Sequence, residues 1–158
     1  MARRLLATYL NDHYAASVGA VQLARRTAGS NRGTRYGEAL EALAAEIEDD
    51  RQALKLIMQR LGIGTDRAKE AVAWTAEKLG RFKLNGQLTG YSPLSRLEEL
   101  EILELGVTGK LLLWEALGRS TADGVNKEEL TTLADRARDQ RRRLEILRLD
   151  AAGEALDA

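Results

Sequence analysis

The segment "EALEALAAEIEDDRQALKLIMQRL", residues 38–61, carries the pattern that decides the fold. Its apolar residues recur every three or four positions, as in a helix that buries one face; they are Leu40, Leu43, Ile47, Leu54, Ile57 and Leu61. The same rhythm places Asp50 on the buried face. An unpaired buried carboxylate is costly, so Asp50 needs a partner. The segment therefore predicts a long helix and a polar site inside the protein.

The composition favours a single domain made of helices. The chain has 158 residues, one Pro and 4% aromatic residues, and it is rich in Ala, Leu, Glu and Arg. Its 24 basic residues balance its 24 acidic residues, so no global field attracts it to nucleic acid or to an anionic membrane. We therefore expect neither nucleic acid nor a membrane as a partner. No segment resembles a phosphate-binding loop or a Ser/His/Asp arrangement.

The sequence also predicts a cytoplasmic location. It contains no Cys, which excludes disulfides and thiolate chemistry. The N-terminal stretch "MARRLLATYLNDHYAAS", residues 1–17, meets polar residues too early for the core of a signal peptide. No apolar run approaches the ~20 residues that a membrane span requires.

Four long helices and one short helix are predicted from the apolar periodicity and from the signals at their ends. Their expected ranges are 2–28, 35–61, 65–80, 93–117 and 127–152. Side chains are expected to cap four of the helix starts, from Thr34, Thr65, Ser92 and Asn126. Glu129 is placed to complete a capping box with Asn126. Glycines are expected just past the helix ends, at Gly29, Gly62, Gly118 and Gly153.

The lengths of the connections predict how the helices are arranged. About six residues join the first two long helices and about nine join the last two, which favours two antiparallel hairpins. About 31 residues, 62–92, connect the hairpins, and a helix of 26 residues is ~39 Å long. So long a connection favours a crossover along the whole bundle, which leaves the third long helix parallel to the second. We therefore expect an all-α four-helix bundle over residues 1–158.

Each long helix carries one large polar residue in the middle of its apolar stripe. These residues are His13, Asp50, Glu104 and Gln140. Counting from the centres of the two short turns places His13 level with Asp50, and Glu104 level with Gln140. We therefore expect a central polar layer to which all four helices contribute.

Two helical hairpins, a full-length crossover and inward polar residues at mid-height resemble the ferritin-like superfamily, over essentially the whole chain. Members with a dimetal centre use a Glu from each of two helices and a Glu-x-x-His from each of the other two. In this sequence His13 takes the place of the first Glu, and Glu104 matches the second. Asp50 has no His three residues later, and Gln140 is followed there by Arg143. The resemblance therefore implies the scaffold without most of the metal ligands.

In the first of two interpretations, the layer is a hydrogen-bonded network. Asp50 would accept hydrogen bonds from His13 and Gln140, or pair with Arg51 or Arg143. The protein would then be non-catalytic, without a cofactor, and would act through its surface. This is the interpretation that we expect.

In the second interpretation, the layer binds Fe or Mn. His13, Asp50 and Glu104 would supply two carboxylates and an imidazole, joined by Glu101 or Glu46. The protein would then be a divergent metal-dependent oxidoreductase or a metal-handling protein.

Four basic residues near the first turn form a candidate surface for an anion or an acidic partner. They are Arg25, Arg26, Arg32 and Arg35. Some of this charge is also expected at a helix C-terminus, where cations are favoured by the helix dipole.

The segment "ELGVTGKLLLW", residues 104–114, raises two further questions. Gly106 and Gly109 each cost a helix about 1 kcal/mol relative to Ala, which indicates close packing or, alternatively, a bulge or a small cavity. The run of apolar residues at its end is too wide for one stripe. Leu113 and Trp114 are therefore expected to face the crossover or another subunit, in a homodimer or with a protein partner.

Overall fold

The structure, a computed structural model, describes residues 1–65 and 90–157. These residues form four helices, which are α1 (Ala2–Ser30), α2 (Gly37–Arg60), α4 (Pro93–Leu117) and α5 (Lys127–Leu156). No strand occurs in these two ranges. The prediction of an all-α bundle is confirmed. The short helix predicted over residues 65–80 falls outside the described residues, apart from Thr65.

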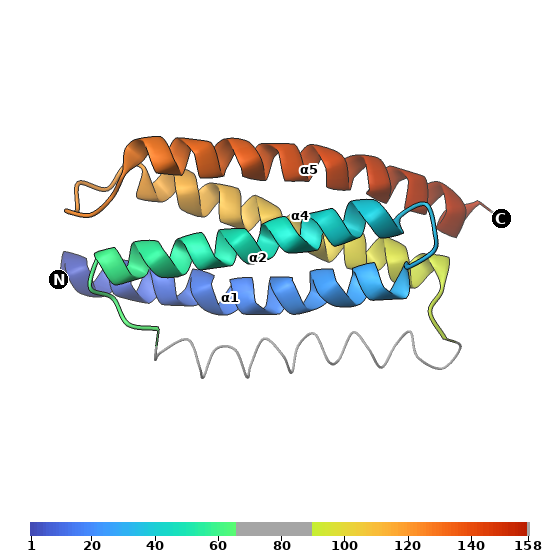
Figure 1. Cartoon of the computed structure of the whole chain (residues 1–158), viewed down its shortest axis with the longest axis horizontal. Coiled ribbons are helices and arrows are strands. Elements are labelled where there is room, and N and C mark those ends of the chain that lie inside the picture. Colours follow the sequence, from blue (N-terminus) through green and yellow to red (C-terminus); the bar gives the residue numbers. More distant parts are fainter. Residues whose placement is uncertain (66–89, 158) are drawn as a thin grey trace.

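The four helices lie side by side along one long axis (Figure 1). α1 and α2 are antiparallel, and so are α4 and α5, whereas α2 and α4 run in the same direction. As a result, α2 ends and α4 begins at opposite ends of the bundle. α1 packs against α2 and α4, and α4 packs against α5.

Two predicted helix starts are confirmed in atomic detail. The Ser92 hydroxyl accepts a hydrogen bond from the Ser95 amide at 3.1 Å, and Pro93 occupies the first turn of α4. Asn126 Oδ1 accepts hydrogen bonds from two backbone amides of α5, at 3.0 and 3.2 Å. The predicted return contact from Glu129 is replaced by an ion pair between Glu129 and Arg60.

Other predicted boundaries are wrong by a few residues. α1 continues through Gly29, and α5 continues through Gly153. α2 begins after Tyr36, and Thr34 accepts a hydrogen bond from the Tyr36 amide before the helix. Gly62 and Gly118 lie just past the ends of α2 and α4, as predicted, and of these two only Gly62 has a left-handed backbone, with a φ of 64°.

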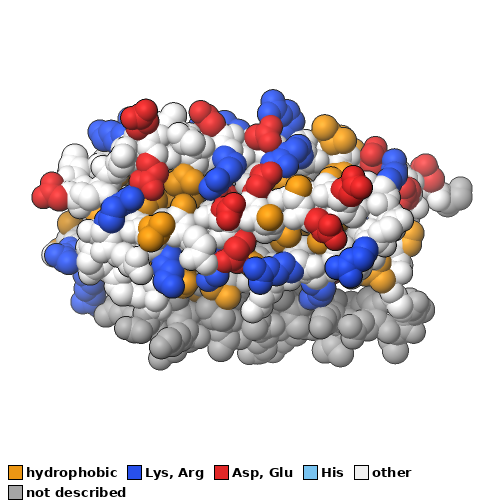
Figure 2. All heavy atoms as spheres, in the orientation of Figure 1, with side chains coloured by type: hydrophobic (Ala, Val, Ile, Leu, Met, Phe, Trp, Pro, Cys, Tyr) orange, Lys and Arg blue, Asp and Glu red, His pale blue; other side chains and the backbone are white. Residues whose placement is uncertain are grey.

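The core lies between the four helices and consists of Leu, Ile, Val and Ala side chains with two large aromatic residues, Tyr36 and Trp114. Leu113 is buried as well, while Leu105 and Leu112 are exposed. On the face of the molecule in Figure 2, Lys and Arg side chains lie among Asp and Glu side chains. The charge balance of the sequence is thus also a local balance on this face.

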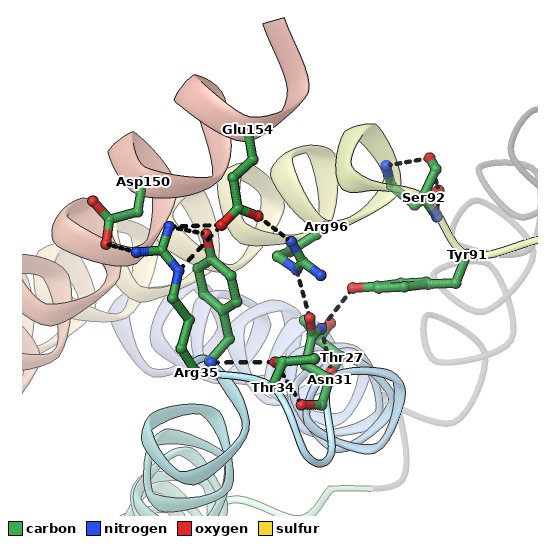
Figure 3. A network of polar contacts seen from close by, with 11 residues as sticks. Thr27, Asn31, Thr34, Arg35, Tyr91, Ser92, Arg96, Asp150 and Glu154 are labelled. Carbon is green, nitrogen blue, oxygen red and sulfur yellow. Dashed lines mark hydrogen bonds and ion pairs between the residues drawn. The ribbon is translucent and has the colours of Figure 1, made fainter. Parts of the chain in front are cut away.

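A group of polar and aromatic contacts around the buried Asn31 joins the α1–α2 turn to the other hairpin at one end of the bundle (Figure 3). Asn31 is fully buried; its amide nitrogen donates to the Tyr91 hydroxyl at 2.7 Å, and its oxygen accepts from Arg96 at 2.6 Å. Arg96 also stacks on the Tyr36 ring at 4.4 Å and pairs with Glu154 at 2.6 Å. Burial raises the pKa of Tyr91 to about 12. We refer to these five residues as the end clamp.

Candidate functional site

The carboxylate of Asp50 lies inside the bundle, with 1% of the side chain exposed. Its Oδ2 accepts a hydrogen bond from Gln140 Nε2 at 3.0 Å and another from Lys110 Nζ. Its Oδ1 forms an ion pair with the guanidinium of Arg136. Three side chains from α4 and α5 therefore hold this one carboxylate of α2.

Gln140 links Asp50 to a second carboxylate. Its oxygen accepts from Lys110 Nζ at 2.5 Å, and its nitrogen donates to Glu46 at 3.2 Å as well as to Asp50. Glu46 is bound in turn by Arg143 at 2.5 Å. Gln140 is fully buried, and both ends of its amide are used. We call the six residues, including Arg136, the ion network.

Two cations of the network face Asp50: Lys110, whose side chain is 14% exposed, and Arg136, whose side chain is 36% exposed. Burial lowers the pKa of Lys110, because desolvation disfavours the ammonium, while the neighbouring Asp50 partly opposes this. Burial raises the pKa of Glu46, but the hydrogen bonds from Arg143 and Gln140 outweigh it, and the pKa lies below its usual value. Of the two carboxylates in the ion network, Asp50 pairs with two cations and Glu46 pairs with one, Arg143.

The predicted contact between Asp50 and Gln140 is present, but the predicted cations are not the ones that pair with Asp50. Arg51 instead binds Glu48, at 2.5 Å, and Arg143 binds Glu46. The actual partner, Lys110, was missed although the sequence carries a signal for it. Lys110 continues a second stripe of α4 with the spacing 3, 4, 3, 4, 3, formed by Leu100, Leu103, Val107, Lys110, Trp114 and Leu117.

The structure does not bring Glu104 to Gln140 as the count from the turn predicted. Glu104 accepts a hydrogen bond from Arg148 at 3.2 Å, and its side chain is about one-fifth exposed. The residue of α5 that contacts Glu104 lies eight positions beyond Gln140. Side chains of both helices lean toward their own N-termini, which contributes about one position per helix to this offset. In an antiparallel hairpin this lean separates residues that are equally far from the turn. Glu101, one turn earlier, is exposed.

His13 is half-buried and lies near Asp50 without a hydrogen bond to it in the described part of the chain. Its ring meets the Tyr9 ring edge-on, with the centroids 4.6 Å apart. Burial lowers the pKa of His13, and the smaller effect of Asp12 raises it. His13 and Asp50 line the same cavity, and the predicted hydrogen bond between them is absent from the described residues.

The dimetal centre that the ferritin-like resemblance implies does not fit the residues present. Over residues 1–65 and 90–157, no three His, Cys, Asp or Glu side chains gather in a way that could hold a metal ion. Asp50, Glu46 and Glu104 are each bound by basic side chains. Basic side chains of the protein therefore compensate the negative charge of these three carboxylates.

The four arginines proposed as an anion surface are each paired with a carboxylate of the same chain. Their ion-pair partners are, in chain order of the arginines, Glu48, Glu99, Glu41 and Glu154. Arg35 is shared between Glu154, at 2.7 Å, and Asp150, at 3.4 Å. Carboxylates of the protein therefore occupy the arginines at this surface, and the pairing does not favour an added anion there.

A cavity of about 240 Å³ lies between α1, α2 and α4, next to the ion network. Gly106 and Gly109 form part of its wall. A Cβ at Gly106 would meet Ala20 only at 3.9 Å, and one at Gly109 would meet no atom within 4 Å in the described part of the molecule. α4 is regular through both glycines. Of the predicted explanations, the described residues therefore support the small cavity.

Comparison with protein families, with curated proteins and with solved structures found no match to this chain. None of the helices in the described ranges is apolar over a length sufficient to cross a bilayer.

Proposed function

We propose that this chain is a ferritin-like four-helix bundle that works by binding and not by metal-dependent catalysis. The directions of the helices support the scaffold, since α2 and α4 run the same way and the connection between them starts and finishes at opposite ends. The cytoplasmic location and the protein partner, whether a second copy or another protein, belong to the same proposal.

The observation that carries the proposal is the position of Lys110 and Arg136 on the Asp50 carboxylate. A divalent metal at Asp50 would face both cations. Two unit charges of the same sign repel by about 4 kcal/mol at 4 Å when the effective dielectric constant is about 20. The interior is therefore arranged to compensate carboxylates with protein cations, which leaves the metal interpretation without its ligand set.

The test is a metal-loading experiment on the whole chain. The protein is incubated anaerobically with Fe²⁺ or Mn²⁺, desalted, and analysed by plasma mass spectrometry beside an Asp50→Asn, Glu104→Gln double variant. We expect no stoichiometric metal in either protein. One or two equivalents in the parent and none in the variant would overturn the proposal in favour of the metal-dependent oxidoreductase or metal-handling protein.

A further inference from the structure

The cavity between α1, α2 and α4 has the size and the apolar walls of a small-molecule site. Its described lining is mainly aliphatic, with Ile47, Leu54, Leu103 and Val107 among the contributors. At about 240 Å³ it is larger than the engineered apolar cavity of about 150 Å³ that binds benzene. It therefore has room for a short alkyl chain or an aryl ring with a substituent.

The cavity borders the ion network at Asp50 and Lys110, which both line it. Lys110 lines the cavity and has three N–H groups, of which Asp50 and Gln140 accept two. In the described ranges no acceptor is present for the third. The Ser17 hydroxyl, which donates to the Tyr14 carbonyl at 2.6 Å, also lies on the wall. A ligand acceptor would thus complete the coordination of the Lys110 ammonium.

The charge of the interior favours an anion as that acceptor. Within the ion network, Lys110, Arg136 and Arg143 carry three positive charges, and Asp50 and Glu46 carry two negative charges. One further negative charge would balance this group. Desolvation of the Lys110 ammonium, seen in its lowered pKa, makes a charged partner more favourable still.

Gly106 and Gly109 of α4 are consistent with a cavity that larger side chains would fill. Each weakens a helix interior relative to Ala, and the side of α4 that they expose borders the cavity. A larger side chain at Gly109 would enter this space without meeting other atoms of the described molecule at its Cβ.

We propose that this cavity binds a small apolar monocarboxylate, with its hydrocarbon part between α1, α2 and α4 and its carboxylate at Lys110. The inference rests on the proposed binding function and names the chemical class of one ligand. It requires no covalent step.

The probe is octanoate, titrated into the whole protein and followed by isothermal titration calorimetry. The matched ligands are 1-octanol and octylamine, which keep the chain but change the head group. We expect saturable one-to-one binding of octanoate, binding of octanol weaker by about tenfold or more, and no binding of octylamine. Equal binding of octanoate and octanol would overturn the role of the carboxylate, and no binding of octanoate would overturn the inference.

Two substitutions test the cavity and the charge of Lys110 separately, and a third serves as a control. Gly109→Leu fills the cavity and should abolish octanoate binding, while Gly153→Leu places the same side chain at an uncrowded helix position of α5 away from the cavity and should leave binding unchanged. Lys110→Met should reduce octanoate binding to the level of octanol. Normal octanoate binding by folded Gly109→Leu protein, checked by circular dichroism, would overturn the site.

The two proposals fail in different experiments. Retention of stoichiometric Fe or Mn overturns the binding bundle itself. Failure of octanoate to bind, in a protein that also retains no metal, overturns only this ligand site.

Discussion

At the scale of single residues, Asp50 is the point on which the interior depends. Its carboxylate satisfies a lysine whose side chain is only 14% exposed, and an arginine whose side chain is 36% exposed. Loss of Asp50 would leave the lysine as a buried charge without a counter-ion, whereas the arginine can turn to solvent. The coupling between Asp50 and Lys110 should therefore be large and measurable.

A double-mutant cycle measures this coupling. Asp50→Leu should destabilise the protein by about 3–5 kcal/mol, as is typical when one partner of a buried pair is removed. Asp50→Leu combined with Lys110→Met should be distinctly more stable than Asp50→Leu alone, because no buried ammonium then remains unpaired. Urea unfolding followed by circular dichroism gives the free energies of unfolding. Strictly additive losses would show that the two residues are not coupled.

At the scale of the elements, the start of α5 depends on one side chain. Asn126 satisfies two amides that would otherwise lack partners at the end of the helix. Its position follows a loop and precedes two acidic residues, Glu128 and Glu129, which also favour a helix N-terminus. The helix boundary at Lys127 is therefore set by local chemistry.

Replacement of this cap should have a modest cost. Asn126→Ala should lower the free energy of unfolding by about 1 kcal/mol, because the two amides lose their acceptor. Asn126→Asp keeps an acceptor and serves as the control, with stability close to the parent. Urea unfolding provides the measurement, and equal stability of the Ala and Asp variants would contradict the capping role.

The register of α4 and α5 is also decided at this scale. Glu104 meets Arg148, and Lys110 meets Gln140. A count of residues from the turn includes neither the lean of side chains toward the N-terminus of each helix nor the rotation of each helix about its axis. The predicted positions of Glu104 and Gln140 along the bundle axis therefore differ from the observed contacts by about two helical turns. That accuracy is not sufficient to identify which residues are in contact.

At the scale of the whole molecule, the end clamp connects the two hairpins. Asn31 belongs to the end of α1, while its partners Tyr91 and Arg96 precede and begin α4. Through Glu154 the same arginine reaches the end of α5. The clamp therefore ties together elements that are distant in sequence and lie at the same end of the bundle (Figure 3).

Removal of Asn31 should loosen that end of the bundle. Asn31→Ala removes one hydrogen-bond partner from each of Arg96 and Tyr91, and we expect a loss of about 1–3 kcal/mol. Hydrogen exchange should accelerate for amides near residues 27–36 and 92–97 before those at mid-bundle. Arg32→Ala, which removes an exposed ion pair, is the control and should change neither quantity. Uniformly faster exchange along all four helices would contradict a local clamp.

Much of the fold could be predicted because its signals are local. The periodicity of residues 38–61 predicts a helix wherever the segment lies, and Ser92 and Asn126 cap the amides that follow them. The contact between Asp50 and Gln140 was also predicted, since both residues interrupt apolar stripes that have to be buried.

By itself, the sequence determined the four long helices of the described chain and the need for partners of Asp50. Only the tertiary structure decided which partners these are, that Lys110 and not Glu104 reaches the network, and that Gly106 and Gly109 border a cavity. The physical reason is geometric. A shift of one residue turns a side chain by about 100° around a helix, so the rotation and the relative height of packed helices select the contacts.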